Sequence, residues 1–235
     1  MRRRITALGC LVIFLSTFSN LPAQITWVGS VSDDIFDEAN WDLSGSAVTM
    51  IDPNVSIMDD VLIGAGPFTN SPVIPQLDGQ QRFQLDDGQT LTVAGNLGIA
   101  GNDGVGGAPG TTNGPTVNVI DGGHFAPFFV VNDVKVNIDG TSSATFGGGG
   151  NPINLSTLDL TSGSLLTFLA ETPDQYRAEH LSKTMVDGVA GIEGVNLSIA
   201  SDGANGSVIT VVPEPSGVLL GLLGGLALFC RRPRR

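Results

Sequence analysis

Hydrophobic and polar residues alternate in short runs along most of the chain. Between residues 24 and 212 these runs include TLTVAGNLGIA, PTVNVIDGG, DVKVNIDG and SVITVV, in which Val, Ile, Leu and Thr recur. A period of two places successive side chains on opposite faces of a β-strand, so each run predicts a strand with one buried face. Asp-Gly and Ser-Gly pairs bound the runs and predict tight turns. The pattern therefore indicates an all-β body.

Three of the runs share one form: an apolar-polar-apolar start, a turn that contains glycine, and a closing phenylalanine. They occupy residues 117–125, 136–146 and 158–168, and their starts lie 19 and 22 residues apart. A further run starts at Leu197, which is 39 residues beyond Leu158. This spacing predicts an irregular right-handed parallel β-helix, a solenoid, over residues 61–212. A β-sandwich is the alternative, because it accepts the same strand lengths and turns.

Two stretches depart from the strand pattern. TPDQYRAEHLSKTM, at residues 172–185, predicts one short helix or helical loop, with Thr172 as its N-cap and Pro173 in its first turn. GNDGVGGAPGTTNGP, at residues 101–115, has few apolar residues and predicts a loop excursion that adds no strand to a coil.

Residues 24–60 predict an N-terminal capping segment. They contain both tryptophans of the chain, Trp27 and Trp41. An open solenoid end exposes unpaired strand edges and an apolar interior, and two indole rings packed over the first coil would cover that interior. The alternative is a carbohydrate-binding platform, because the flat indole faces suit sugar rings.

The first 23 residues predict a secretory signal peptide. Arg2, Arg3 and Arg4 precede an apolar core, and the LPA sequence predicts cleavage between Ala23 and Gln24. The two cysteines, Cys10 and Cys230, lie in the terminal segments. The body therefore has no disulfide and depends on its core and its strand pairing for stability.

Residues 213–235 form a distinct C-terminal segment, in which Pro213, Glu214 and Pro215 precede an apolar run and a basic cluster. The apolar run contains Val218, Leu219, Leu220, Leu222, Leu223, Leu226, Leu228 and Phe229, and the basic cluster contains Arg231, Arg232, Arg234 and Arg235. We expect a C-terminal hydrophobic helix. An apolar run of 13 residues gives a helix about 20 Å long, shorter than the hydrocarbon core of about 30 Å. The arginines would hold the C-terminus on the cytoplasmic side, so the segment predicts a brief membrane stop.

Charge limits the partners and the chemistry. Between Arg4 and Arg231 the chain has four basic residues and 23 acidic residues, a formal charge of −19. Such a surface repels phosphate backbones, so we expect no nucleic-acid partner. The acidic residues around Asp33, Asp34 and Asp37 could hold Ca²⁺ loosely, although no run matches a calcium-loop pattern. No catalytic motif and no other cofactor motif is present in the sequence, so we expect no enzymatic activity.

The C-terminal segment resembles the PEP-CTERM sorting signal of exported bacterial proteins. The resemblance covers Pro213-Glu214-Pro215, the apolar run and the basic cluster, in the order typical of that family. It implies processing by an exosortase-type membrane protease in bacteria that make extracellular polysaccharide. The body is similar to autotransporter-like β-solenoid repeat proteins, through Trp27-Val28-Gly29, Ala39-Asn40-Trp41 and the strand at residues 59–63. This second resemblance implies no catalytic residues.

Together these observations predict a non-enzymatic exported protein of the cell surface or extracellular matrix. The expected partners are the export machinery, the exosortase-type protease and, through the C-terminal segment, the membrane. Transient or stable anchoring in the inner membrane would precede arrival at the cell surface. Two alternatives stay open: a carbohydrate-binding module that contacts extracellular polysaccharide, and a polysaccharide-active enzyme.

Overall fold

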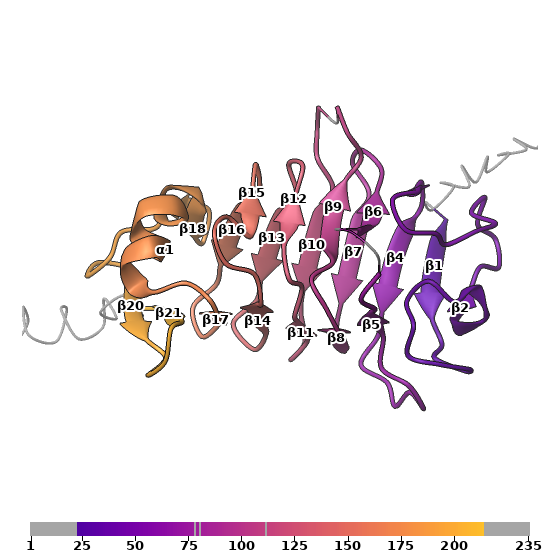
Figure 1. Ribbon diagram of the computed structural model, residues 1–235, viewed down its shortest axis with the longest axis horizontal. Helices are drawn as coiled ribbons and strands as arrows, with labels where there is room; N and C mark the ends of the chain where they lie inside the picture. Colours follow the sequence, from indigo (N-terminus) through magenta and orange to yellow (C-terminus); the bar gives the residue numbers. More distant parts are fainter. Residues whose placement is uncertain (1–22, 78, 80, 111, 214–235) are drawn as a thin grey trace, which may run out of the picture.

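The computed structural model describes residues 23–77, 79, 81–110 and 112–213, which form a β-solenoid of about five turns with a single α-helix (Figure 1). Strands of successive coils pair in parallel, whereas the strands of a sandwich pair antiparallel. The solenoid prediction is therefore confirmed, and the sandwich alternative is wrong. The predicted C-terminal hydrophobic helix and the signal peptide before Ala23 lie outside the described residues.

Three sheets form the walls of the solenoid. Sheet I has the strand order β19-β18-β16-β13-β10-β7-β4-β1-β2, sheet II has the order β20-β21-β17-β14-β11-β8-β5, and sheet III has the order β15-β12-β9-β6-β3. Sheet I contains β1 (Gln24–Trp27), β2 (Trp41–Asp42), β4 (Asp60–Ile63), β7 (Thr90–Val93), β10 (Thr116–Val119), β13 (Lys135–Ile138), β16 (Thr157–Leu160), β18 (Thr184–Val186) and β19 (Val189–Ala190). Sheet II contains β5 (Val73–Ile74), β8 (Asn96–Ile99), β11 (His124–Phe125), β14 (Ser143–Phe146), β17 (Leu165–Phe168), β20 (Leu197–Ser201) and β21 (Ser207–Val211). Sheet III contains β3 (Ser56–Ile57), β6 (Arg82–Leu85), β9 (Gly104–Gly107), β12 (Val130–Val131) and β15 (Ile153–Asn154).

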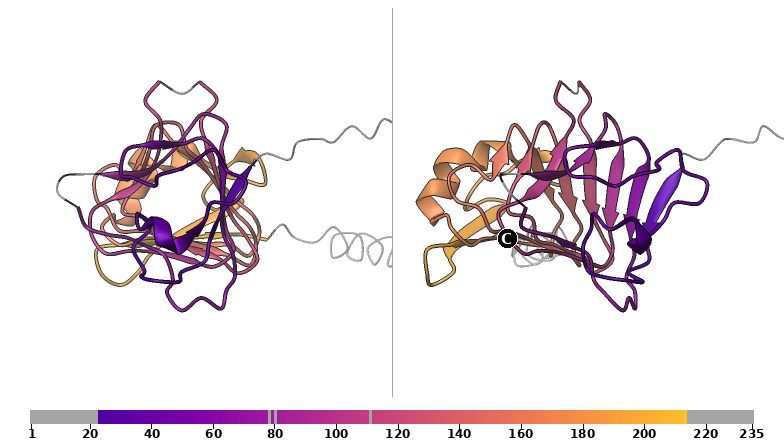
Figure 2. Two further views of the ribbon diagram at one scale, coloured as in Figure 1. Left: turned by 90° about the vertical axis from the view of Figure 1, so that its right-hand side faces the viewer. Right: turned by 45° about the vertical axis from the view of Figure 1, so that its right-hand side comes forward.

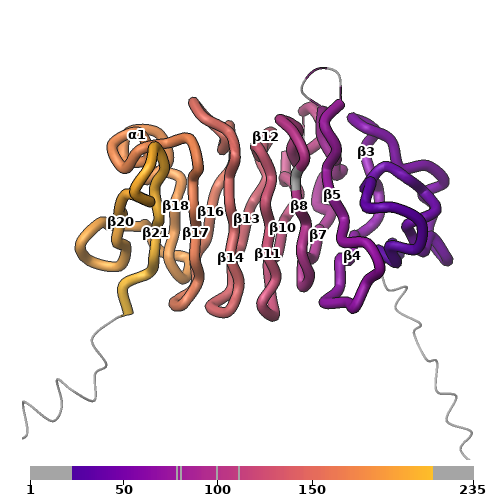
Figure 3. Tube along the Cα trace, turned by 60° about the horizontal axis from the view of Figure 1, so that its bottom comes forward, coloured from indigo at the N-terminus to yellow at the C-terminus, as the bar shows by residue number. Residues whose placement is uncertain are grey.

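Each coil contributes one strand to every sheet. Consecutive triplets from β3-β4-β5 to β15-β16-β17 make up the coils, which lie side by side in Figure 3. Viewed end-on, the coils superpose around a common interior (Figure 2, left). The predicted repeat appears directly in the register, because Val117 pairs with Val136 and Val136 pairs with Leu158.

Alternation along each strand sends every second side chain into this interior. Leu91, Val117, Val136 and Leu158 follow one another across sheet I and are fully buried. Burial of one such aliphatic side chain contributes about 1.5–3 kcal/mol. A slip of one residue would turn the whole row toward solvent, so this apolar column fixes the pairing between coils.

The closing phenylalanines of the repeat form a second buried column, in sheet II. Phe146 pairs with Phe168, and the two rings are stacked with their centroids 5.1 Å apart. Phe125 pairs with Ala144 instead of Phe146. The ring of Phe125 meets that of Phe146 edge-on at 6.4 Å. A large ring thus lies beside the small Ala144 side chain, which keeps the interior filled.

The N-terminal segment extends sheet I beyond the first coil. β1 pairs in parallel with β4, and the two-residue strand β2 pairs antiparallel with β1 as the last strand of the sheet. The chain between β1 and β2 includes the 3-10 helix η1 (Glu38–Asn40). The buried side chain of Asn40 fixes this connection, because its Oδ1 accepts hydrogen bonds from the backbone N–H groups of Val31 and Ser32. A very short edge strand of this kind limits further pairing with other chains.

The C-terminal end departs from the predicted repeat. The run that begins at Leu197 does not add a coil: β20 and β21 form an antiparallel hairpin, and β21 pairs antiparallel with β17. The prediction is wrong because the chain reverses between these strands, where Asp202 Oδ1 accepts from the N–H groups of Ala204 and Gly206. A second hairpin, β18–β19, ends sheet I in the same way.

The predicted helix is confirmed as α1 (Pro173–Glu179), which is followed by the 3-10 helix η2 (Leu181–Lys183). Thr172 is the N-cap, and its side chain accepts from the backbone N–H of Gln175 while the Gln175 side chain accepts from the N–H of Thr172. This reciprocal arrangement is a capping box. Pro173 occupies the first helical position, where its missing N–H costs nothing.

The prediction of a loop for residues 101–115 is wrong in its central part. Residues 104–107, of sequence GVGG, form β9, which pairs with β6 on one side and β12 on the other. Val105 is its one apolar inward side chain and is fully buried. Glycine weakens the interior of a strand, because it has no side chain to pack. It is found in strands where a neighbouring group approaches the backbone closely. That close approach creates the candidate functional site.

Candidate functional site

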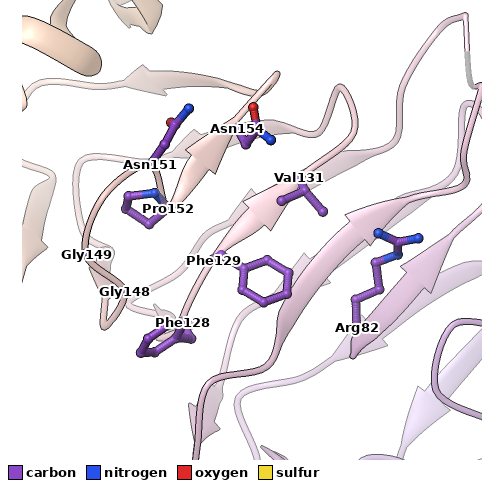
Figure 4. Close-up of a pocket in the computed structure, with 9 residues that line it drawn as sticks. All are labelled: Arg82, Phe128, Phe129, Val131, Gly148, Gly149, Asn151, Pro152 and Asn154. Atoms are coloured by element: carbon purple, nitrogen blue, oxygen red, sulfur yellow. The ribbon is translucent and has the colours of Figure 1, made fainter. Parts of the chain in front are cut away.

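A groove on the outer face of sheet III is a candidate binding site. It has a volume of about 220 Å³. Figure 4 shows Arg82 on one side, the loop before β15 on the other, and Phe129 between them. The groove is lined by Arg82, Phe128, Phe129, Val131, Gly148, Gly149, Asn151, Pro152 and Asn154.

The glycines of β9 make room for the side chains that border this groove. Gly106 lies beside Gln84 and Val131 in the sheet register. A Cβ atom on Gly106 would lie 2.5 Å from Cδ of Arg82, and one on Gly104 would lie 2.7 Å from Cδ2 of Phe129. Arg82 and Phe129 therefore lie across a strand that has no side chains of its own on this face.

The guanidinium of Arg82 is oriented by its neighbours in the sheet. Its Nε donates to Oε1 of Gln84 at 2.9 Å, and Nε2 of the buried Gln84 donates to Oγ of Ser56 at 2.6 Å. No partner of the two terminal nitrogens, Nη1 and Nη2, is found in the part of the chain that the structure describes. The N–H groups of both terminal nitrogens, which can bind the two oxygens of a carboxylate, thus remain for a ligand.

A second cation stands at the opposite edge of the groove. Nζ of Lys183, from η2, donates to Oδ1 of Asn151 at 2.9 Å and to the backbone oxygen of Ile153 at 2.8 Å. The first bond fixes one lining side chain, and the second ties the helical segment to β15. Burial lowers the pKa of Lys183, which lies near the carboxylates of Glu179 and Glu171.

The side chains that line the groove have the chemistry of a binding site. Its side chains are one guanidinium, two phenyl rings, two amides and aliphatic groups, with no carboxylate, imidazole, hydroxyl or thiol. Such a set can neutralise an anion, cover an apolar surface and hydrogen-bond to hydroxyls. It contains no general base or nucleophile.

The two histidines of the chain lie away from the groove lining. Nδ1 of His124 lies 2.8 Å from Oγ of Ser143 on the neighbouring strand, and burial lowers the pKa of His124. His180 is fully buried beside Glu171. No third group that would complete a catalytic triad with His124 and Ser143 is recorded among the described residues.

The predicted ligand platform, Trp27 and Trp41, is buried: the two residues are 0% and 6% exposed. The rings meet edge-on at 5.1 Å, and Trp41 is stacked on Phe83 at 5.9 Å. Both indole N–H groups donate to backbone oxygens, that of Trp27 to Asn70 and that of Trp41 to Ile35. Neither ring offers a free face to a sugar, and the placement corresponds to the capping alternative.

The remaining predicted site residues lie at or beyond the ends of the described chain. Ala23 precedes β1, and its backbone oxygen accepts from the N–H of Asp60, while Gln24 is the exposed first residue of β1. Pro213 is the last described residue. Glu214, Pro215, the apolar run and the basic cluster lie outside the described residues. Across residues 23–213, apart from the three gaps, no helix has the length and apolar character needed to cross a bilayer.

No group of three or more His, Cys, Asp or Glu side chains that could hold a metal ion occurs within the described ranges. The acidic residues after β1 serve local structure instead. Oδ1 of Asp34 accepts from the N–H of Phe36, and Oδ1 of Asp37 accepts from the N–H of Ala39. These contacts shape the turn and the start of η1.

Sequence reasoning missed the groove because its members are dispersed. Arg82 reads as an isolated cation, and Phe128 and Asn154 lie far from it in the sequence. One signal was available: in GVGG the single branched residue, Val105, sits between glycines. This alternation is typical of a strand whose inner face is apolar and whose outer face has no side chains.

No family model matches the chain, and no curated protein or solved structure matches it either. The solenoid fold therefore stands on the strand pairing, and the likeness of the C-terminal segment to a sorting signal stands on its residues alone.

Proposed function

We propose that the chain is a non-enzymatic, exported protein of the bacterial surface or extracellular matrix. Its body is a right-handed β-solenoid, and its PEP-CTERM-like segment directs it to an exosortase-type protease. The export machinery would carry the body across the inner membrane, with the C-terminal segment as a transient or stable anchor. The acidic composition of the body favours solubility outside the cell.

The arrangement of the chain ends carries this proposal. β1 lies at one end of the solenoid and β21, the last strand before Pro213, lies at the other (Figure 1). A membrane stop after Pro213 would therefore leave the coils extending away from the bilayer. Sheet I ends in an antiparallel strand at each end, β2 and β19, and sheet II ends in the antiparallel hairpin β20–β21, so these edges limit the addition of a further coil.

Mass spectrometry of both termini of the protein, isolated from the cells that produce it, tests the proposal. We expect a mature N-terminus near Gln24 and loss of the residues that follow the Pro213-Glu214-Pro215 triplet. Replacing the triplet by alanines should leave the segment attached and the protein in the membrane fraction. Glu38→Ala, an exposed glutamate in the body, is the matched control and should be processed normally.

Recovery of an intact C-terminus, with Arg235 present, from the outer surface would contradict the processing step. Recovery of the whole protein from the cytoplasm would contradict export itself.

A further inference from the structure

We propose that the groove over β9 binds a carboxylated sugar residue, a hexuronate, of an acidic polysaccharide. Arg82 would bind the carboxylate, Phe128 would pack on the sugar ring, and the amides of Asn151 and Asn154 would bond to its hydroxyls. This site does not depend on where the protein is sorted, because it is formed entirely by the body.

The distribution of positive charge singles out this groove. The described body has four basic side chains: Arg82, Lys135, Arg177 and Lys183. Arg177 is already neutralised, because it forms ion pairs with Asp174 and Glu193. Arg82 lines the groove and Lys183 holds one of its lining residues, whereas no carboxylate lines it. On a strongly acidic protein, an anion therefore finds a favourable site here.

The geometry of Arg82 favours a carboxylate over a diffuse negative charge. A guanidinium presents parallel N–H groups that match the two oxygens of a carboxylate. Gln84 holds Nε, so the rotation of the guanidinium is restricted before the ligand arrives. Less conformational entropy is then lost when the ligand binds.

The rest of the lining suits a sugar better than an acidic peptide. Phe128 is half-buried and offers an apolar surface, which fits the C–H face of a pyranose ring. Asn151 and Asn154 are exposed, and each amide carries both donors and an acceptor for hydroxyl groups. Because Oδ1 of Asn151 is occupied by Lys183, its Nδ2 is the group that remains for a ligand.

The size of the groove limits the ligand to a short unit. Its volume of about 220 Å³ is below the range of about 300–1,000 Å³ that encloses drug-sized ligands. One sugar ring of a longer chain would occupy it, with neighbouring rings outside. We therefore expect weak binding by a single groove.

The test is a titration of the purified protein with a galacturonate oligomer, a neutral galactose oligomer of equal length, and a glutamate oligomer. We expect the galacturonate oligomer to bind at least about tenfold more tightly than the galactose oligomer, because only the former offers a carboxylate to Arg82. We also expect it to bind more tightly than the glutamate oligomer, which has no sugar ring for Phe128 and no hydroxyl groups for the two amides. Binding should weaken as salt is added, since the groove is open to solvent. Nuclear magnetic resonance shifts or calorimetry would measure the affinities.

Variants locate the binding. Arg82→Gln should lower the affinity for galacturonate about tenfold or more, and Arg82→Lys should keep only part of it because the planar fork is lost. Phe128→Ala should weaken binding of the sugar, and Gly106→Ala should weaken it because a Cβ atom displaces the Arg82 side chain. Lys135→Gln is the matched control: Lys135 is exposed on sheet I, away from the groove, and its replacement should leave binding unchanged. Thermal unfolding identifies any variant whose fold is altered.

Several results would overturn the proposal. These are equal affinity for the galacturonate and galactose oligomers, equal or tighter binding of the glutamate oligomer, no binding at millimolar ligand, or a folded Arg82→Gln variant that binds like the unmodified protein. None of these results bears on the cleavage of the C-terminal segment, so failure of this site and failure of the sorting proposal are distinguishable.

Discussion

The two ends of the solenoid solve the same problem with different chemistry. At each end an aromatic side chain packs on the last phenylalanine of the interior: Trp41 on Phe83 at the N-terminal end, and His180 on Phe168 at the C-terminal end. Both contacts are close to parallel, at interplanar angles of 12° and 11°. The polar atoms of these two rings determine whether the contribution of each ring to stability depends on pH.

The two indole rings that close the N-terminal end bond to the chain through neutral groups. The indole N–H of Trp27 donates to the backbone oxygen of Asn70 at 3.0 Å, and that of Trp41 donates to the backbone oxygen of Ile35 at 2.8 Å. A buried indole keeps its packing surface and loses no polar partner in such an arrangement. The contribution of these indole contacts to stability should not change with pH.

The C-terminal end buries two ionisable groups. Oε2 of Glu171 lies 2.6 Å from Nε2 of His180, and both residues are fully buried. Burial, with the nearby charge of Glu179, raises the pKa of Glu171 to about 7. Burial, with the nearby charge of Lys183, lowers the pKa of His180 to about 4. The neutral forms are favoured, so between these values the pair holds one proton.

Tyr176 completes this polar end from α1. Its ring packs edge-on against Phe168 at 5.2 Å, and its hydroxyl lies 2.7 Å from Oγ1 of Thr184. Oγ1 of Thr184 in turn donates to the backbone oxygen of His180. The hydrogen bonds join α1 to β18, so the helix is held over the interior by polar contacts as well as by packing. The comparison shows that an apolar repeat is ended by rings that carry polar atoms.

The largest effect should come from Trp41→Ala at the N-terminal end. Removal of a buried large aromatic side chain costs about 3–5 kcal/mol, because a cavity remains. Urea denaturation should show this loss as a lower midpoint with little change in slope. The loss should be the same at pH 5 and pH 7, because no ionisable group titrates in the contact.

Trp41→Phe is the matched control for this prediction. It retains an aromatic ring against Phe83 but loses the five-membered ring of the indole, with the N–H that bonds to the backbone oxygen of Ile35. The loss should be smaller, about 1–3 kcal/mol for the unpaired buried oxygen. If both variants were as stable as the unmodified protein, the rings would not close this end.

At the C-terminal end, the two single substitutions Glu171→Gln and His180→Gln should give pH dependences of opposite sign. Between about pH 4.5 and 6.5, Glu171 is ionised and His180 is protonated in the unfolded chain. In the folded protein Glu171 is protonated and His180 is neutral, so the pair holds one proton in both states. The pair then adds no slope to the pH dependence of the unfolding free energy. In Glu171→Gln, His180 is neutral when folded and charged when unfolded, so stability rises with pH toward 6.5. In His180→Gln, Glu171 is protonated when folded and ionised when unfolded, so stability falls as pH rises from 4.5 toward 7.

Relative to the unmodified protein, the slope of the unfolding free energy against pH should approach the value for one proton, about 1.4 kcal/mol per pH unit. Urea midpoints at several pH values between 4.5 and 6.5 would measure it. For Trp41→Phe at the other end, the plot of stability against pH should run parallel to that of the unmodified protein. Parallel curves for all three variants would show that Glu171 and His180 do not differ in protonation between the folded and unfolded states.

The repeat, the interior and the helix could be predicted from the sequence, because each has a local signal. Strict alternation around Val117, Val136 and Leu158 fixes the strand faces and the pairing register. Thr172 and Gln175 mark the start of α1 within four residues. The fate of the run at Leu197 could not be predicted, since a strand of a hairpin and a strand of a coil have the same alternation.

The candidate groove could not be predicted either, because it depends on contacts between coils. Arg82 reaches the groove only because β9 places Gly104 and Gly106 beside it, and Asn154 lies on β15, three coils after Arg82. The pairing of Glu171 with His180 also depends on the fold. The two residues lie at opposite ends of α1, and burial shifts the pKa values of both. Such sites need the fold before their residues can be grouped.

The smallest effects should come from the two capping residues of α1, where Thr172→Ala removes the N-cap. The hydroxyl of Thr172 accepts from the N–H of Gln175 at 3.4 Å, a long bond, so we expect a loss near the middle of the usual range, about 1 kcal/mol. Gln175→Ala keeps the N-cap hydroxyl and removes the two bonds in which Oε1 of Gln175 accepts from the N–H and the hydroxyl of Thr172, both at 2.9 Å. It should cost less, because both donors are exposed to water. Amide hydrogen exchange would separate a local effect from a global one: protection should fall in α1 and β18 while the strands around Val117 keep theirs. If protection fell equally along all the coils, the C-terminal end would unfold together with the repeat, and the two ends would be parts of one cooperative unit instead of separate closures.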